Sequence, residues 1–582
     1  MVVPLLVGVT IVVLRRHLSR RQLWMLTLAA SLAVVGLAAA LLVAVHGGLH
    51  VYWFGGWTPR HGVVLGVSFT VDSFAAIGAL FAGVLVSAVV LVGTRVESFG
   101  PLAHALTLVL LAAAVGFCLT GDLFNLFVFF ELMSVCTIAL LAVNTGDLRA
   151  LRAALHFAIV NSIGAFFVLI GIALLYARTG ALNLAVIGQR LAAHPTDQLV
   201  VTAFALILVG FLVKAAIVPF HFWLVDAATA ATAPVAMLLV GLLDTLGLYA
   251  VARVYWTVFS GPLHAHLALV QAVLIAAGVT TAILGALLCL VQPIATRRLA
   301  FVSISHSGLA LIAVGLLNPV GLAGFGIYAC ADGATKAALF ALVRAPGRDR
   351  GHGQGLVPGW SGGRVGAVLV VLAAVALAGL PPGGTFLAKG LIEDGASGWG
   401  RVLLSGLVLV VSAVTASAVL RLVVPRRAGV GTEVRRVEPA ATAGRWSLPL
   451  LAAAGLLVGA FVLGVVPGLG ARSVTAATRV EDRSVYAATV VGVARPASPS
   501  GGTVDLGLVP VVLGIAATAA AWGIARRPQL GASRGVRSPD EAALATPLQW
   551  MQQLHRGGIG DSAAWLTFGT ATIGAVLALG IR

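Results

Sequence analysis

Long apolar runs recur from one end of this chain to the other, and they restrict its fold more than any other feature. A helix of about 20 residues crosses a hydrocarbon layer of about 30 Å, because it rises 1.5 Å per residue. We count about sixteen runs near that length, which predicts an all-α polytopic membrane protein with about 16 transmembrane helices. They lie near residues 1–14, 22–46, 63–92, 103–120, 122–143, 150–177, 198–221, 233–257, 266–291, 299–317, 320–343, 366–392, 402–424, 446–468, 504–525 and 562–581. The first is short, and we expect it to be retained because no signal cleavage site is evident.

The basic residues are distributed unevenly between the connections. The formal net charge of +17 would suggest nucleic-acid binding in a soluble protein. However, most of the 34 arginines lie in the odd-numbered connections, among them 15–21, 344–350, 425–436 and 525–537. By the positive-inside rule these connections are cytoplasmic. The pattern predicts a multi-pass protein of the cell membrane with both termini on the outer side, and it excludes nucleic acid as a partner.

The chain has only three lysines, and all of them fall inside apolar runs: Lys214, Lys336 and Lys389. Arginine keeps its charge in proteins, whereas a buried lysine can release its proton. Ionisable groups within the bilayer are costly and are usually functional. The three lysines therefore predict a proton pathway.

Two acidic residues lie in the same part of the chain. Glu131 is ten residues inside its apolar run, so it needs a cation or stays protonated. We expect Lys214 to be its partner, either in proton transfer or in a merely structural ion pair. Asp244 is a second intramembrane acid, and a role for it requires that its side chain avoids lipid and points toward Lys214.

Four further residues are auxiliary candidates. Asp332 lies four residues before Lys336, so the two share a helix face, as a functional pair or as a self-neutralised one. Asp72 lies near a membrane entry in the third run and is expected to cap the start of a helix. His221 is either a proton relay or a histidine satisfied by the backbone, and we expect His306 to lie close to an interface or a cavity.

Prolines interrupt two of the lysine-bearing runs. Pro219 follows Lys214, and a Pro-Pro pair precedes Lys389, where FLAK repeats the earlier FLVK. Proline breaks a helix, and broken helices in transporters line binding sites. The two lysines lie five runs apart, in the seventh and the twelfth run, which predicts two halves of opposite topology. We divide the chain into N-terminal helices (1–100), a first half (101–257), a second half (258–425) and a C-terminal region (426–582).

Motifs for other chemistry are absent from the sequence. The four cysteines, Cys118, Cys136, Cys289 and Cys330, lie in apolar runs and lack metal-ligand spacing. No phosphate-binding, flavin, quinone or iron–sulfur pattern is present. We expect no metal, no cofactor and no catalytic or redox site in this chain. A lipid-linked transferase would need acidic or histidine clusters in a large loop, and the sequence has none.

Five segments carry a resemblance to a known family. In chain order they are TGDLFNLFVFFELMS, KAAIVPFHFWLVDA, RRLAFVSIS, ATKAALFAL and LAGLPPGGTFLAKGLI. Residues 60–425 resemble the antiporter-like subunits of Mrp-type cation/proton antiporters, respiratory complex I and membrane-bound hydrogenases. The first segment is most similar to the D subunit of the Mrp antiporters.

The resemblance implies two inverted five-helix repeats and a proton path through Glu131, Lys214, Lys336 and Lys389. It implies other membrane subunits as partners, and protons and, in an antiporter, a monovalent cation as the transported ions. Three functions stay open: a subunit of a multi-subunit cation/proton antiporter, a proton-pumping subunit of a redox complex of the NADH-quinone oxidoreductase or hydrogenase type, and a non-conducting scaffold.

The chain departs from the family pattern at four positions. Thr245 replaces a lysine, Ala228 replaces a histidine and Val225 replaces a proline. Asp332 replaces a histidine four residues before Lys336. Two relay positions are lost and two acids stand nearby, which predicts altered coupling, a cation site or a loss of conduction.

Overall fold

The structure is a computed structural model of the whole chain. It describes residues 1–45, 48–59, 64–96, 99–143, 145–193, 196–343, 363–423, 443–492, 508–526 and 559–581. The arginine-rich connections at 344–350 and 425–436, and most of 525–537, lie outside these residues.

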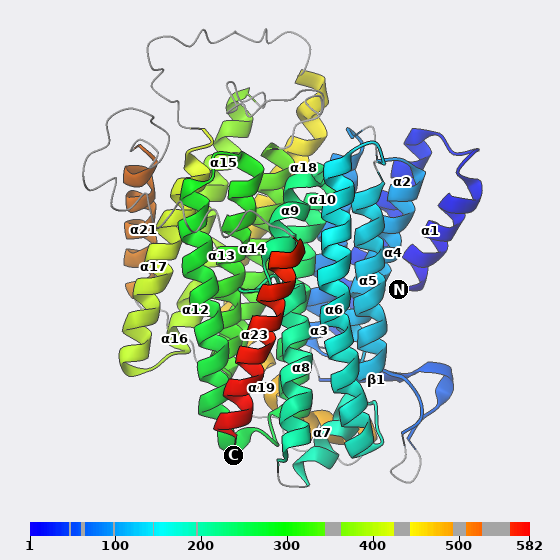
Figure 1. Cartoon of the computed structure of the whole chain (residues 1–582). Helices are drawn as coiled ribbons and strands as arrows, with labels where there is room; N and C mark the ends of the chain where they lie inside the picture. Colours follow the sequence, from blue (N-terminus) through cyan, green and yellow to red (C-terminus); the bar gives the residue numbers. More distant parts are fainter. Residues whose placement is uncertain are drawn as a thin grey trace.

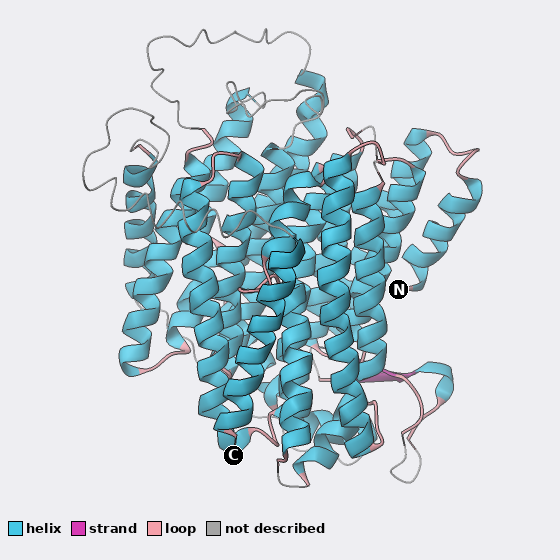
Figure 2. Cartoon of the chain, viewed as in Figure 1, coloured by secondary structure: helices cyan, strands magenta, loops and turns pink. Residues whose placement is uncertain are grey.

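Helices account for nearly all of the described chain (Figure 2). The first part contains α1 (Val2–Leu14), α2 (Arg20–Ala44), α3 (Ser73–Gly93), α4 (Pro101–Leu119), α5 (Leu123–Ala142), α6 (Leu148–Thr179), α7 (Leu184–Ala192), α8 (Gln198–Lys214), α9 (Phe222–Ala230), α10 (Ala233–Leu238) and α11 (Asp244–Val254). The second part contains α12 (Leu267–Val291), α13 (Ala295–Gly315), α14 (Pro319–Val343), α15 (Gly363–Ala378), α16 (Gly384–Asp394), α17 (Gly398–Leu420), α18 (Ala443–Val465), α19 (Leu469–Glu481), α20 (Arg483–Val491), α21 (Val509–Ala525) and α23 (Ile559–Gly580). Short 3-10 turns lie at η2 (Phe54–Gly56) and η5 (His264–His266), and π-helical turns at η3 (Leu239–Leu243) and η4 (Tyr255–Phe259).

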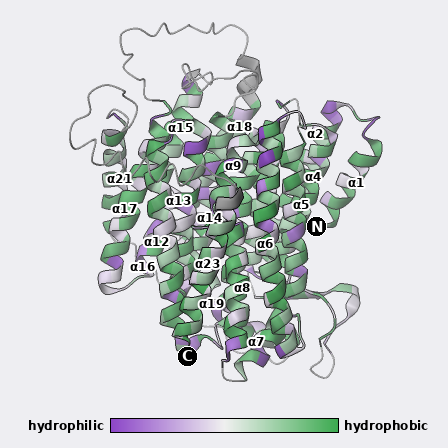
Figure 3. Ribbon diagram, viewed as in Figure 1, coloured by the Kyte–Doolittle hydropathy of each residue, from purple (hydrophilic) through white to green (hydrophobic). Residues whose placement is uncertain are grey.

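Twelve helical segments of the described chain are long and apolar enough to cross a membrane. Four shorter apolar helices, α1, α8, α15 and α21, coincide with predicted runs. Hydrophobic residues follow the helices over most of their length (Figure 3). The all-α membrane class is confirmed, and the exact number of 16 spans is not.

The two predicted helix breaks are confirmed. The first separates α8 from α9, and the second separates α15 from α16. Pro219 lies in the first break, where Ala216 has a positive φ of 53°. Pro381 and Pro382 lie in the second, which begins at Gly379 with a φ of 80°. Each break interrupts the backbone beside a lysine.

The core of the bundle is formed by helices from both halves. The segment Ala295–Gly315 is buried along its whole apolar window, and Ala233–Phe259 is almost as fully enclosed. The helices α2 and α23 are mostly exposed and lie at the periphery (Figure 1). The only strands among the described residues, β1 (His50–Trp53) and β2 (Ser68–Val71), pair antiparallel, with His50 opposite Val71. The buried charges therefore lie on the central helices.

Candidate functional site

Lys214 ends the first half of the broken helix and is 1% exposed. Its Nζ donates to the Asn161 Oδ1 at 3.2 Å, to the Phe130 carbonyl at 3.4 Å and to the Ser134 hydroxyl. The ammonium also lies 4.3 Å from the centre of the Phe130 ring. These neutral acceptors and the ring face replace part of the hydration that the ammonium loses on burial.

The expected direct ion pair between Glu131 and Lys214 is absent. The two charged groups do not approach within 4.0 Å, and the Oε1 of Glu131 is buried without a hydrogen bond. Glu131 nevertheless neighbours the acceptors of the lysine along α5, one residue after Phe130 and three before Ser134. Lys214 therefore contacts the Phe130 carbonyl and the Ser134 hydroxyl of α5 instead of the Glu131 carboxylate.

Lys336 lies between two carboxylates and is 3% exposed. Its Nζ is 2.8 Å from Asp244 Oδ2 and 3.1 Å from Asp332 Oδ2. The predicted pair on α14 is thereby confirmed. Asp244 is buried, as required, but it points to Lys336 and not to Lys214, so that expectation was wrong. Ser307 and the Thr245 backbone also donate to Asp244, which starts α11 directly after the π-helical turn η3.

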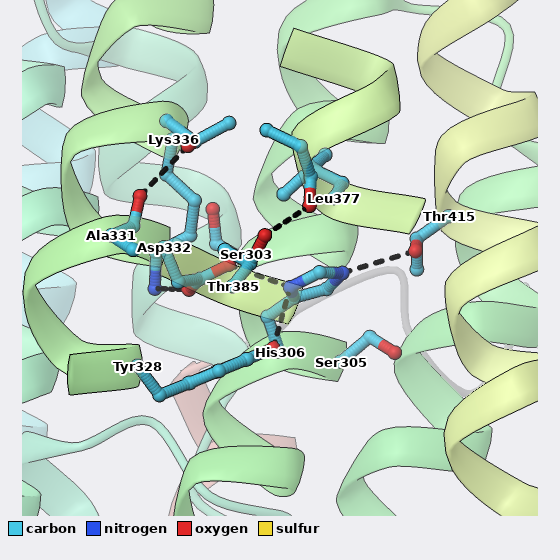
Figure 4. Close-up of polar contacts among 12 residues, drawn as sticks. Ser303, Ser305, His306, Tyr328, Ala331, Asp332, Lys336, Leu377, Thr385 and Thr415 are labelled. Atoms are coloured by element: carbon cyan, nitrogen blue, oxygen red, sulfur yellow. Dashed lines mark hydrogen bonds and ion pairs between the residues drawn. The ribbon is translucent and has the colours of Figure 1, made fainter. Parts of the chain in front are cut away.

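His306 extends this network away from Asp332. Its Nδ1 lies 2.6 Å from Asp332 Oδ1 and 2.8 Å from the Tyr328 hydroxyl, and its Nε2 lies 3.0 Å from Thr415 Oγ1 (Figure 4). The Thr415 hydroxyl donates to the Val411 carbonyl, so its oxygen accepts from the ring. Both ring nitrogens therefore face oxygen atoms of neighbouring side chains. His306 is fully buried, so of the two expected positions, close to an interface or to a cavity, the interface is excluded.

Lys389 lies on α16, just past the second break, and is 4% exposed. Its Nζ donates to the Leu377 carbonyl and, at 2.7 Å, to the Ser412 hydroxyl. Ser412 and Thr415 are one turn apart on α17, and the Thr415 hydroxyl lies 3.3 Å from the Ser412 carbonyl. Polar groups therefore follow one another from Asp244 through Lys336, Asp332 and His306 to Lys389.

Asp72 caps α3 as predicted, since its Oδ1 accepts from the Ala75 backbone at 2.8 Å. It also forms a bidentate ion pair with Arg253 of α11, at 2.6 and 2.8 Å. Arg253 is 2% exposed and was missed from the sequence. The only available signal was its position as an arginine within an apolar run.

Two further buried groups lie close to the two breaks. His221 is 1% exposed in the first break, with its ring centre 4.3 Å from that of Phe222. Glu393, one turn after Lys389, is 2% exposed and accepts from Ser405 at 3.1 Å. Sequence reasoning missed Glu393, although its i, i+4 spacing from the lysine pointed to it. Within the described ranges, no group of three His, Cys, Asp or Glu residues could hold a metal ion.

The broken helices and enclosed charges define a class of membrane proteins with ionisable groups inside a helical bundle. Comparison with known proteins identifies the family. Residues 120–415 match the family described as NADH:quinone oxidoreductase/Mrp antiporter, TM, and the chain belongs to it.

Its relatives come from more than one kind of complex. The chain is 33% identical to the D subunit of a probable K(+)/H(+) antiporter of Rhizobium meliloti (strain 1021), over 60% of this chain and 68% of that protein. It is 30% identical to an NADH-quinone oxidoreductase subunit N of Desulforudis audaxviator (strain MP104C), over 75% and 88% of the two chains. A chain in the structure of the Mrp complex from Dietzia sp. DQ12-45-1b superposes with a TM-score of 0.71 and 27% identity, covering 84% of this chain and 98% of that one.

Proposed function

We propose that this chain is the proton-translocating membrane subunit of a multi-subunit cation/proton antiporter, similar to the D subunit of the Mrp type. The observation that carries the proposal is the placement of its lysines. All three lysines of the sequence are at most 4% exposed, and each has hydrogen-bond partners inside the bundle. A protein that needed lysine only for solubility would place it at the surface.

The proposed path has two parts. Lys214 exchanges its proton beside Glu131, which lies on the helix that supplies two of its acceptors. The break after Lys214 packs against α11, where a Cβ on Gly247 would come within 2.7 Å of the Ala215 nitrogen. Asp244 lies one turn before Gly247, at the end of the second part of the proton path that faces this break. We propose that water carries the proton between Lys214 and Asp244.

The second part runs through side chains in contact. A proton that reaches Asp244 weakens the hold of that carboxylate on Lys336, and the change in charge is felt by Asp332 and His306. Lys389 then exchanges a proton with one side of the membrane. Each group that gives up a proton regains one before the next cycle, and no covalent step is needed.

A second candidate function is proton pumping within a redox complex. The 30% identity to an NADH-quinone oxidoreductase subunit over 88% of that relative favours it. A chain in the structure of the membrane-bound sulfane sulfur reductase also superposes, with a TM-score of 0.70 and 26% identity. The third candidate, a scaffold that does not conduct, predicts that replacement of Lys214 changes assembly and leaves flux intact.

The deciding experiment is gentle purification of the chain from its native membrane, followed by mass spectrometry of the associated proteins. Small hydrophobic subunits without redox proteins support the antiporter, and cation-dependent proton flux in vesicles would then be measured. Co-purification of iron–sulfur or flavin subunits would contradict the antiporter function and support the redox pump. Loss of flux in Lys214→Ala at unchanged assembly excludes the scaffold. We further propose the cell membrane as its location, with both termini on the outer side.

A further inference from the structure

A second histidine of the bundle, His156 of α6, is held by two helices that lie far apart in the sequence. Its Nδ1 lies 3.0 Å from Asp226 Oδ2 on α9, and its Nε2 lies 2.7 Å from Ser562 Oγ on α23. His156 and Ser562 are each 4% exposed, whereas the Asp226 side chain is 31% exposed. The ring is therefore enclosed, but the carboxylate that orients it reaches the molecular surface.

His156 lies between the arginine-bearing start of α6 and Lys214. Arg149 and Arg152 occupy the first two turns of the helix, in a connection predicted to be cytoplasmic. Asn161, an acceptor of the Lys214 ammonium, follows His156 by five residues, or about 8 Å along the helix axis. The ring of Phe157, the next residue, has its centre 5.8 Å from the Lys214 Nζ. One helix thus carries the enclosed imidazole and a ligand of the lysine.

The partners of His156 suit both of its protonation states. In the neutral ring, Nδ1–H donates to Asp226 and the Ser562 hydroxyl donates to Nε2. In the charged ring, Nε2–H donates to the same hydroxyl oxygen. Ser562 has no other hydrogen bond within the described part of the chain, so its hydroxyl can turn. At His306, by contrast, the corresponding hydroxyl of Thr415 is committed to a backbone carbonyl.

The helix that supplies Ser562 also touches the first break. A Cβ on Gly569 of α23 would come within 2.4 Å of Pro219 and 2.8 Å of Phe220. Trp565 lies 6.3 Å from Phe222, measured between ring centres. In Figure 1, α23 runs along α8 at the front of the bundle, in agreement with its contacts. This helix lies outside residues 120–415, which match the family.

We propose that His156 carries protons between the arginine-rich end of the bundle and Lys214, with Asp226 as its orienting residue and Ser562 as its reversible hydrogen-bond partner. The inference rests on the proposed proton-translocating function. In each cycle the ring gains one proton from the side of Asp226 and releases one toward Lys214, so charge and protons balance. The order Asp–His–Ser also occurs in hydrolytic triads, but a nucleophilic serine must face a substrate, and Ser562 is enclosed.

The test is proton flux in vesicles from cells that express the full chain with its membrane partners, normalised to the amount of folded protein. We expect His156→Gln to lower flux by about ten-fold or more, since removal of a proton-transfer group typically costs that much. It should also change the dependence of flux on pH, because a group that carries the proton is removed. Asp226 is the charged group that faces the ring, and Arg152 lies exposed one turn earlier on α6.

Substitutions on α23 separate proton transfer from packing. Ser562→Ala should lower flux several-fold, and Ser562→Thr should retain it because the hydroxyl is kept. Thr567→Ala, on an exposed part of the same helix, is the matched control and should have no effect. Normal flux with a normal pH profile in both His156→Gln and Ser562→Ala, while Lys214→Ala is inactive, would overturn the role of His156 alone. Full flux in Lys214→Ala would overturn the proposed function itself.

Discussion

Lys214 and Lys336 are both buried on central helices, yet the bundle holds them in opposite ways. Lys214 has a carbonyl, an amide oxygen, a hydroxyl and an aromatic ring around its ammonium, and no carboxylate within 4.0 Å. Lys336 has two carboxylates within 3.1 Å. The first lysine is bound by dipoles and the second by charges.

This difference separates two tasks. When Lys214 gives up its proton, its neutral partners are left without an unbalanced charge, so the loss is tolerated. When Lys336 does so, two buried carboxylates are left without their common cation, which is costly. Lys214 is therefore suited to releasing a proton, and Lys336 is suited to holding its proton and transmitting charge.

The largest expected effect is on transport through Lys214. Lys214→Met should lower proton flux at least about 100-fold, because the group that carries the proton is gone. The free energy of unfolding should change by less than about 1 kcal/mol, since an isolated buried charge and its desolvation cost are removed together. Flux assays in vesicles and thermal unfolding in detergent measure the two quantities. A strongly destabilised variant would contradict the comparison.

The next effect is on stability through Lys336. Lys336→Met leaves Asp244 and Asp332 without their common cation, and we expect a loss of about 3–5 kcal/mol in the free energy of unfolding. The double variant Lys336→Met/Asp244→Asn should recover at least about 1 kcal/mol of that loss, because one uncompensated charge is neutralised. Thermal unfolding of the three proteins tests this. Strictly additive effects would show that the ion pair does not couple the residues.

A smaller effect is expected at the second break. Gly379 has a φ of 80°, and a Cβ there would lie 3.0 Å from Lys389 Cδ. Gly379→Ala should lower the free energy of unfolding by about 1–2 kcal/mol, the cost of a left-handed conformation with a side chain. Gly406→Ala on α17 has open space around the added methyl and is the control. Equal stability of the two variants would show that the close approach to Lys389 is not required.

The smallest effect concerns one acceptor of Lys214. Ser134→Ala removes a hydroxyl and leaves Phe130 and Asn161 in place, so we expect a loss of about 1 kcal/mol in the free energy of unfolding. Ser134→Thr keeps the hydroxyl and serves as the control. If Ser134→Ala cost as much as Lys336→Met in the same unfolding assay, Lys214 would depend on a single partner and the contrast between the lysines would fail.

Much of the fold could be predicted from the sequence, because transmembrane spans, helix breaks and i, i+4 pairs depend on local spacing. Asp332 and Lys336 pair as expected for that reason. The partners of Asp244 and Glu131 depend on how the helices are rotated relative to one another. That rotation cannot be read from the spacing of residues in one sequence. Arg253 was overlooked because arginine was taken as a marker of connections, whereas a buried bidentate carboxylate can hold it inside the bundle.

The hydrogen bond between His156 and Ser562 spans 406 residues of sequence. During synthesis, α6 and the broken helix enter the membrane long before α23 is made. Until then the His156 ring lacks one partner, and the break at Pro219 lacks the helix that covers it. The His156 site is therefore completed only after the second half of the bundle has been inserted. A chain that stops before α23 would leave the His156 imidazole without its serine partner.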